Sequence, residues 1–142
     1  MNYKFNKGQS LFEVILALAV VALILVTVVS LAAFSVRNSS YSKNKTIAER
    51  YVQQAIEWLR GERDANSTTF FNRSGNYCIN NLSFISGQCS GNISGTVFKR
   101  ELAISKTTVN LKTVLKTEVI VSWSDGQGIH EARSITYFSD WR

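Results

Sequence analysis

Residues 14–34 read VILALAVVALILVTVVSLAAF, a stretch in which only Thr27 and Ser30 fall outside the hydrophobic set. No charged residue occurs between Glu13 and Arg37. An α-helix needs about 20 apolar residues to cross the hydrocarbon core of a bilayer, and this stretch has that length. We therefore interpret it as a membrane-spanning helix.

Three other interpretations of this apolar stretch compete with that one: a cleaved secretory signal, a plain single-span anchor, and the buried helix of a soluble domain. Secretory signals have apolar regions of about 7 to 15 residues, so the stretch is too long for that class. A buried soluble helix would need a large core around it. The rest of the 142-residue chain is too polar and too short to supply one, and it has room for only one small domain.

The junction before the apolar stretch is more specific than the stretch itself, and it reads KGQSLFE over residues 7–13. Ser10 and Glu13 match a capping box, in which the serine caps a helix and the glutamate bonds back to its amide. A glutamate at the edge of a membrane helix is also a functional candidate, because an unpaired charge there costs free energy. Capping does not account for Gly8, which ends a short basic leader.

This junction resembles the start of type IV pilins and their relatives, the minor pilins and the pseudopilins of type II secretion. The resemblance implies that a prepilin peptidase cuts after Gly8 and that the new N-terminal residue, Gln9, is N-methylated. It also implies that Glu13, fifth in the mature chain, meets the N-terminal amine of a neighbouring subunit during assembly. Phe is the commonest first residue in the family, so Gln9 departs from the usual pattern while the glycine and the glutamate match.

The same resemblance implies the location and the partners of the chain. We expect a single-pass protein of the inner (cytoplasmic) membrane, with a cytoplasmic leader and an exported head that later joins an extracellular or periplasmic filament. The expected partners are the membrane, prepilin peptidase and other pilin or pseudopilin subunits, with no small-molecule substrate. The basic residues after the apolar stretch alone would favour the opposite orientation; the leader motif decides, because the peptidase acts on the cytoplasmic side.

Helical periodicity continues beyond the apolar stretch. There is no Pro or Gly between residues 9 and 60, apolar residues repeat at helical spacing over 48–59, and Gly61 is expected to end the helix. One helix of this length would span about 78 Å at 1.5 Å per residue. The expected segments are a leader (1–8), the membrane and assembly half of the helix (9–36), its amphipathic half (37–61) and a β-rich head (62–142).

The segment 64–96 is rich in Asn, Ser and Gly and predicts loops with short strands. It contains Cys78 and Cys89, the only cysteines of the chain. An even pair in an exported domain favours one disulfide, which would contribute about 3 kcal/mol by closing so short a loop. A redox pair would have closer CxxC-like spacing, and a metal site would need further ligands.

The last third of the chain predicts β-strands. Apolar and polar residues alternate over 98–104 and 119–123, the sequence DGQG at 125–128 signals a turn, and 129–138 reads as a returning strand. The expected fold class is α+β, with a long N-terminal α-helix packed on a small antiparallel β-sheet head of three or more strands. Residues 119–142 resemble the ends of PilV-type minor pilins and I-type pseudopilins, which is a softer resemblance than that of the junction.

The sequence contains no phosphate-binding glycine loop, nucleophile elbow or zinc spacing, and we expect neither an enzyme nor a bound metal or cofactor. His130, the only histidine, is expected to be a solvated residue on a strand. The expected function is that of a structural subunit of a filament or secretion apparatus.

Two alternatives remain. One is a single-pass anchored, exported domain that keeps its leader and never assembles. The other is a nucleic-acid-binding pilin tip, which the formal net charge of +6 would suit. That alternative requires basic and aromatic residues to cluster on the head, namely Arg73, Lys99, Arg100, Trp123 and Trp141.

Overall fold

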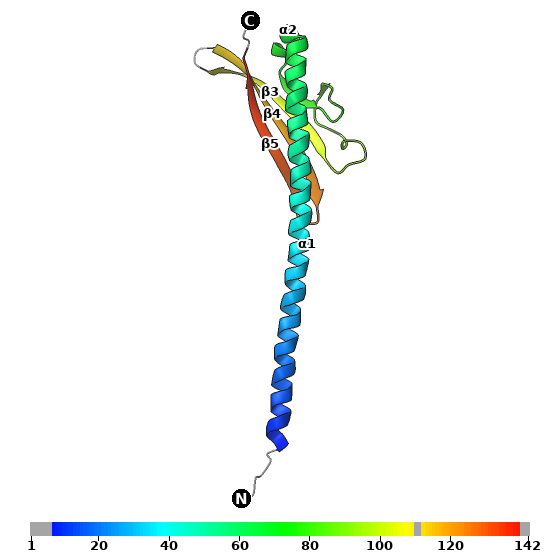
Figure 1. The fold of residues 1–142 in the computed structure, drawn as a ribbon. Helices are drawn as coiled ribbons and strands as arrows, with labels where there is room; N and C mark the ends of the chain where they lie inside the picture. The colour runs from blue at the N-terminus through cyan, green and yellow to red at the C-terminus, as the bar shows by residue number, and fades with distance from the viewer. Residues whose placement is uncertain (1–6, 110–111, 140–142) are drawn as a thin grey trace, which may run out of the picture. The chain divides into compact units, whose positions relative to one another are not determined.

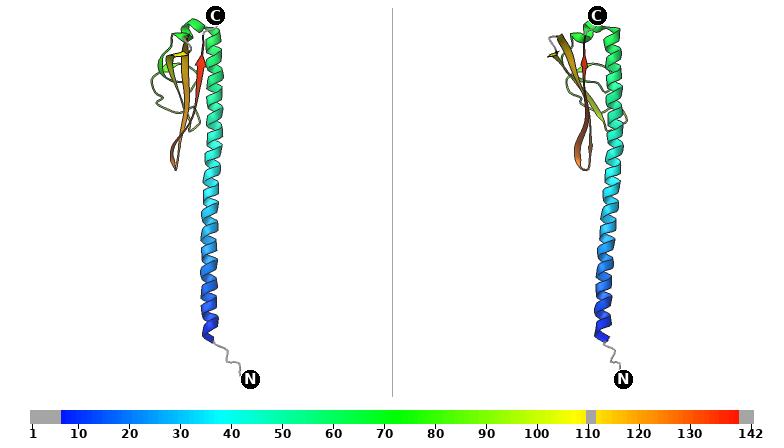
Figure 2. Two further views of the ribbon diagram at one scale, coloured as in Figure 1. Left: turned by 90° about the vertical axis from the view of Figure 1, so that its left-hand side faces the viewer. Right: turned by 60° about the vertical axis from the view of Figure 1, so that its left-hand side comes forward.

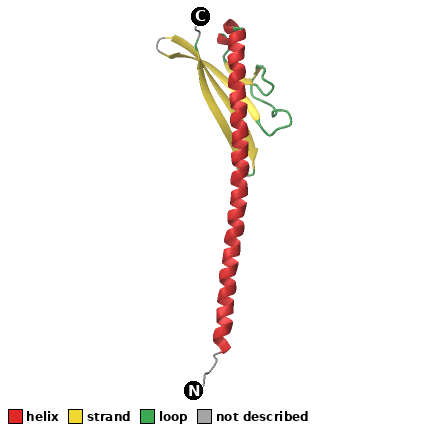
Figure 3. Ribbon diagram, viewed as in Figure 1, coloured by secondary structure: helices red, strands yellow, loops and turns green. Residues whose placement is uncertain are grey.

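The computed structural model describes residues 7–109 and 112–139, which form two helices and one five-stranded sheet (Figures 1 and 3). The fold class is α+β, as the sequence predicts. Residues divide between two compact units, with the boundary between Ser42 and Lys43. The elements are α1 (Lys7–Ala65), α2 (Ser67–Phe71), β1 (Gly75–Cys78), β2 (Ile85–Ser86), β3 (Lys99–Val109), β4 (Lys112–Asp125) and β5 (Gly128–Phe138).

The first unit contains the apolar part of α1. Its most apolar 18-residue window has a mean hydropathy of 3.2, so the helix is long and apolar enough to cross a membrane. The Thr27 hydroxyl donates to the Ile24 carbonyl at 2.7 Å, and the Ser30 hydroxyl donates to the Val26 carbonyl at 2.9 Å. Both hydroxyls are thus satisfied within the helix, which suits them to an apolar environment.

In the second unit, α1 continues past Gly61 to Ala65, so the prediction that Gly61 ends the helix is wrong. A glycine inside a helix costs only about 1 kcal/mol relative to alanine. Packing on either side outweighs that cost, because Leu59 is fully buried and the Arg63 guanidinium lies 5.5 Å from the centre of the Phe138 ring. Tertiary contacts therefore decide where this helix ends.

The short helix α2 lies in a segment that the sequence predicted to be loop and short strands. Asn66 caps it, since its side-chain oxygen accepts the Thr69 backbone N–H at 3.1 Å. Phe70 holds it against the core, where this ring is 1% exposed and lies edge-on to Phe138 at 5.2 Å. A five-residue helix has too little periodicity to be recognised in the sequence.

All strand pairs of the sheet are antiparallel, in the order β2-β1-β3-β4-β5. Strands β3, β4 and β5 form the predicted meander. Asp125 and Gly128 close the turn between β4 and β5, and the Asp125 carboxylate accepts the Gln127 N–H at 2.8 Å. Gly128 has a φ of 129°, which residues with a side chain rarely adopt. The predicted turn at 125–128 is confirmed.

The core of the second unit lies between one face of α1 and one face of the sheet, which run side by side in Figures 1 and 2. Of the six helix residues predicted from their spacing, Tyr51 is half-buried and the other five are buried: Ala48, Val52, Ala55, Ile56 and Leu59. The sheet contributes alternating residues, also as predicted: Phe98, Leu102, Ile104, Val119, Val121 and Trp123. Tyr51 and Phe98 join the two layers, with ring centres 5.5 Å apart.

Candidate functional site

The first candidate site is the apolar surface of α1 over residues 11–36. Every large hydrophobic side chain in this segment is between 49% and 70% exposed within the chain. These side chains surround the helix, which is the pattern of a helix buried in a membrane or among other helices. Soluble monomers rarely expose apolar patches larger than a few hundred Å², so this surface is a candidate contact surface for a membrane or for other helices.

Glu13 lies at the start of this apolar surface and is exposed. Since α1 begins at Lys7, Ser10 lies inside the helix and is not its N-cap. The capping box therefore does not account for the carboxylate. Gly8 and Gln9 lie in the first turn of α1, and the side chains of Gln9 and Ser10 are outside the described residues.

The second candidate region is the loop that Cys78 and Cys89 enclose in the head. The two cysteines form the predicted disulfide, with Cα atoms 4.8 Å apart, and both are buried. The Cys89 N–H donates to the Glu101 carboxylate at 3.0 Å, and the Asn80 amide donates to the Gly91 carbonyl at 2.8 Å. The loop is thus fixed to β3 by a covalent bond and by hydrogen bonds.

Arg100 lies in the core and connects this loop to α1 through hydrogen bonds of its guanidinium group. It is 2% exposed, and all the oxygens that it contacts belong to uncharged groups. Its Nε donates to the Ile79 carbonyl at 3.0 Å and its Nη2 to the Asn80 carbonyl at 3.0 Å. On the helix, its Nη1 donates to the Tyr51 carbonyl at 3.3 Å and to the Gln54 side-chain oxygen at 2.9 Å.

Burial lowers the pKa of the Arg100 guanidinium, and its interaction with Tyr51 offsets part of that effect. Sequence reasoning missed this role and named Arg100 only among the residues that the nucleic-acid-binding alternative would require to cluster on the head. A signal was present, because Arg100 falls between Phe98 and Leu102 in the alternation of β3 and so shares their inward face.

The cluster required for nucleic-acid binding does not form as postulated. Arg100 is in the core, Trp123 is 2% exposed, and Trp141 is outside the described residues. The Arg73 guanidinium lies 3.8 Å from the centre of the Phe84 ring, and Lys99 begins β3 and is half-buried. Among the described residues of this set, no exposed tryptophan is therefore available for base stacking.

His130 lies on β5, two residues after Gly128, so its predicted place on a strand is confirmed. Its side chain is half-buried where the sequence predicted a solvated one. Its Nε2 lies 2.9 Å from the Asp125 carboxylate, and its ring centre lies 5.4 Å from that of Trp123. Two hydrogen bonds hold the pKa of the Asp125 carboxyl below its usual value. The larger effect comes from the Gln127 backbone N–H and the smaller from the His130 side chain. Within the described residues, no group of three or more His, Cys, Asp or Glu side chains could hold a metal ion.

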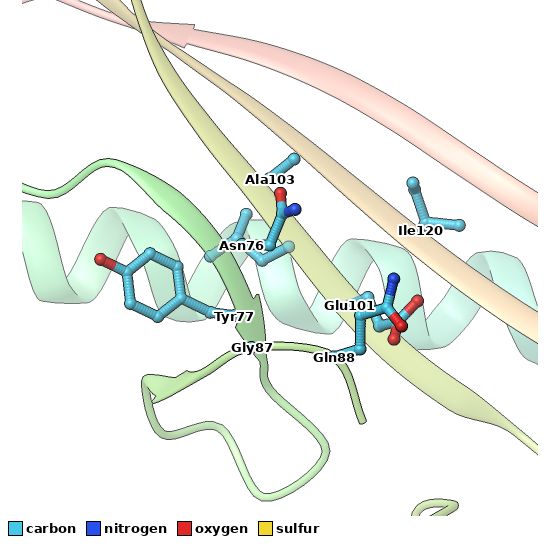
Figure 4. A pocket seen from close by; sticks show the side chains of 8 residues that line it. Asn76, Tyr77, Gly87, Gln88, Glu101, Ala103 and Ile120 are labelled. Carbon is cyan, nitrogen blue, oxygen red and sulfur yellow. The ribbon is translucent and has the colours of Figure 1, made fainter. Parts of the chain in front are cut away.

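A small cavity of about 180 Å³ opens on the head beside β1 and β3 (Figure 4). Glu101 provides the carboxylate in its lining, next to Gln88 and Asn76, and that carboxylate already accepts the Cys89 N–H. The Glu101 carboxylate in this lining thus takes part in anchoring the loop.

Comparison of the chain with protein-family models, with curated proteins and with solved structures finds no match.

Proposed function

We propose that this chain is a structural subunit, of the minor pilin or pseudopilin type, of a type IV pilus-like filament or a type II secretion-like apparatus. The observation that carries the proposal is the apolar surface of α1 over residues 11–36, which is exposed on all sides within the chain. A membrane covers such a surface in the single chain. A bundle of like helices covers it equally well after assembly.

Glu13 gives the proposed bundle its register. A carboxylate in an apolar bundle is costly unless an opposite charge pairs with it. Cleavage after Gly8 would create a free amine on Gln9, four residues before the carboxylate in the sequence. Pairing of Glu13 with the Gln9 amine of a neighbouring chain would offset both charges and fix the axial offset between the two helices.

The head suits the exported side of the membrane. Disulfides persist in oxidising compartments and are rare in the cytosol, and the head contains the buried Cys78–Cys89 bond. This observation supports an orientation in which residues 43–142 lie outside the cytoplasm and the leader lies inside.

Mass spectrometry of the N-terminus tests the proposal most directly. The full chain is expressed in a host with a prepilin peptidase, and the membrane and sheared-filament fractions are analysed separately. We expect a chain that begins at methylated Gln9 in both fractions, whereas Gly8→Ala should give the uncut precursor in membranes alone. An intact leader on the wild-type chain would overturn the proposal and favour the anchored domain that never assembles.

Glu13→Ala separates assembly from insertion. We expect this variant to be cleaved and membrane-bound but missing from the filament fraction, because the N-terminal amine has lost its partner. Thr27→Ala is a matched control within the same apolar stretch, and it should assemble normally because the Thr27 hydroxyl bonds only within its own helix. Normal incorporation of Glu13→Ala would refute the role given to this carboxylate.

A further inference from the structure

The free edge of β5 is the feature of the head that the proposed function leaves unused. β5 has 11 residues and is the last strand of the sheet, and among the described residues only β4 pairs with it. An edge strand presents a row of unpaired N–H and C=O groups that can pair with another strand. Its length makes it a candidate for pairing between chains.

The register of the hairpin shows which residues of β5 face this edge. A two-residue turn lies between the paired residues Asp125 and Gly128, and residues that close such a turn form a hydrogen-bonded pair. Every second residue from Gly128 therefore bonds to β4. Thr136 belongs to this set, and its carbonyl also accepts the Thr117 hydroxyl of β4 at 3.0 Å.

The backbone groups of the intervening residues point away from β4 and toward the free edge. Four of these residues have side chains on the exposed face of the sheet in the order apolar, acidic, basic, apolar: Ile129, Glu131, Arg133 and Ile135. Ile129 is 83% exposed and Ile135 is 45% exposed. The order matters because an antiparallel copy of the same strand presents it in reverse.

We propose that two copies of this chain pair through their β5 edges, antiparallel, about a two-fold axis at Ala132. In this register Glu131 lies opposite the partner's Arg133, and Arg133 lies opposite the partner's Glu131. Ile129 lies opposite the partner's Ile135, and the reverse pair repeats by symmetry. Opposite charges and apolar residues directly across an antiparallel pair stabilise it, so the edge is complementary to itself.

Side chains at the axis leave room for this contact. Ala132 would face the partner's Ala132 in a pair that is not hydrogen-bonded, where Cα atoms approach to about 4.5 Å. Edge strands commonly carry charges that repel a second strand. Within the chain Arg133 already pairs with Glu131 of its own strand and with Glu118 of β4 at 2.9 Å. In the proposed contact, Glu131 and Arg133 of each chain would exchange part of this pairing for the opposite charges of the partner.

The contact is different in kind from filament assembly through α1. A two-fold contact uses the same surface on both copies and closes after two chains, whereas a filament needs a contact that repeats without closing. Because the two strands run in opposite directions, the two heads also point in opposite directions. The pairing of heads through β5 does not depend on the proposed function.

Charge exchange within the strand tests the pairing. The full chain in detergent is compared with Arg133→Glu, with Glu131→Arg and with the double variant Glu131→Arg/Arg133→Glu by sedimentation equilibrium. Each single variant places like charges opposite one another twice per dimer and should weaken dimerisation about tenfold, whereas the double variant restores opposite charges and should recover it. Equal dimerisation of all four chains, or failure of the double variant to recover, would overturn the proposal.

Cross-linking at the axis distinguishes the β5 edge from association through α1. Both native cysteines are in the disulfide, so Ala132→Cys introduces one free thiol at a position where the pair geometry allows a disulfide. We expect a covalent dimer on mild oxidation, and much less of it when Arg133→Glu is added. Ser105→Cys, on the exposed part of β3, is the control for random collision. Equal cross-linking at residues 105 and 132 would refute the contact.

Discussion

Replacing Arg100 with methionine tests whether the buried guanidinium holds the head together. Methionine keeps most of the apolar stem but removes every donor. The substitution leaves three backbone carbonyls without their present partner, those of Ile79, Asn80 and Tyr51. Water can replace the guanidinium at Gln54, whose side chain belongs to an exposed residue.

The cost follows from how deeply each carbonyl lies. A buried acceptor left without a partner costs about 1 to 3 kcal/mol. The Ile79 carbonyl is fully buried but keeps the Leu82 backbone N–H at 3.1 Å as a donor, and the Tyr51 carbonyl lies inside α1 and keeps its helical hydrogen bond. Each of these two carbonyls therefore loses one donor without being left unpaired, and the half-buried Asn80 carbonyl incurs part of the cost. Removing a buried cation that no carboxylate neutralises returns part of this free energy. We therefore expect Arg100→Met to lower the free energy of unfolding of the head by about 1 to 3 kcal/mol.

Urea unfolding of the full chain in detergent, followed by tryptophan fluorescence, measures this loss. Trp123 is 2% exposed in the head core and reports its opening. The matched control is Lys106→Met on the same strand, where the side chain is exposed and the change should be within about 0.5 kcal/mol. A loss below about 1 kcal/mol for Arg100→Met would show that these hydrogen bonds of the guanidinium are not needed and would refute the reasoning.

Three further predictions concern the head. Replacing Cys78 and Cys89 together with serine should lower the free energy of unfolding by about 3 kcal/mol, and reductant should then leave the variant unchanged while it destabilises the wild type. Leu59→Ala should lower it by about 2 to 5 kcal/mol in the same urea assay, because the side chain is fully buried and leaves a cavity. Because the pKa of Asp125 is lowered in the folded head, its ionised carboxylate contributes to stability. This contribution is fully present above the ordinary pKa of an aspartate and is lost as the pH falls through the lowered pKa. The midpoint temperature of thermal unfolding should therefore fall less steeply from neutral to acidic pH for Asp125→Asn than for the wild type.

Local periodicity predicted most of the fold. Helical spacing identified the buried face of α1 from Ala48 to Leu59, and alternation identified the inward residues of β3 and β4. Both patterns are repeated over many residues, so a few exceptions do not hide them. The end of α1 at Ala65 was not predictable in this way, because it depends on contacts such as that between Arg63 and Phe138.

The role of Arg100 shows a different limit of sequence reasoning. Charged residues are seldom buried, so the sequence analysis did not expect Arg100 in the core. Its hydrogen bonds go to four oxygens from two distant segments, one around Tyr51 in α1 and one around Ile79 in the disulfide loop. The alternation around Arg100 could have indicated its inward face, but no local pattern identifies the partners that make its burial possible.

The apolar surface of α1 contrasts with Arg100. Its sequence clearly predicts an apolar helix, but its side chains are exposed in the single chain. The large apolar side chains of residues 11–36 are each about half to two-thirds exposed in the part of the chain that the structure describes. A membrane would satisfy the apolar side chains but gives Glu13 no opposite charge. A neighbouring chain with a free amine at Gln9 would satisfy both, which is why cleavage at Gly8 and the carboxylate of Glu13 belong to the same proposed step. A variant that keeps Glu13 but blocks cleavage should therefore fail to assemble as completely as one that lacks Glu13, and it should do so without any change in the stability of the head.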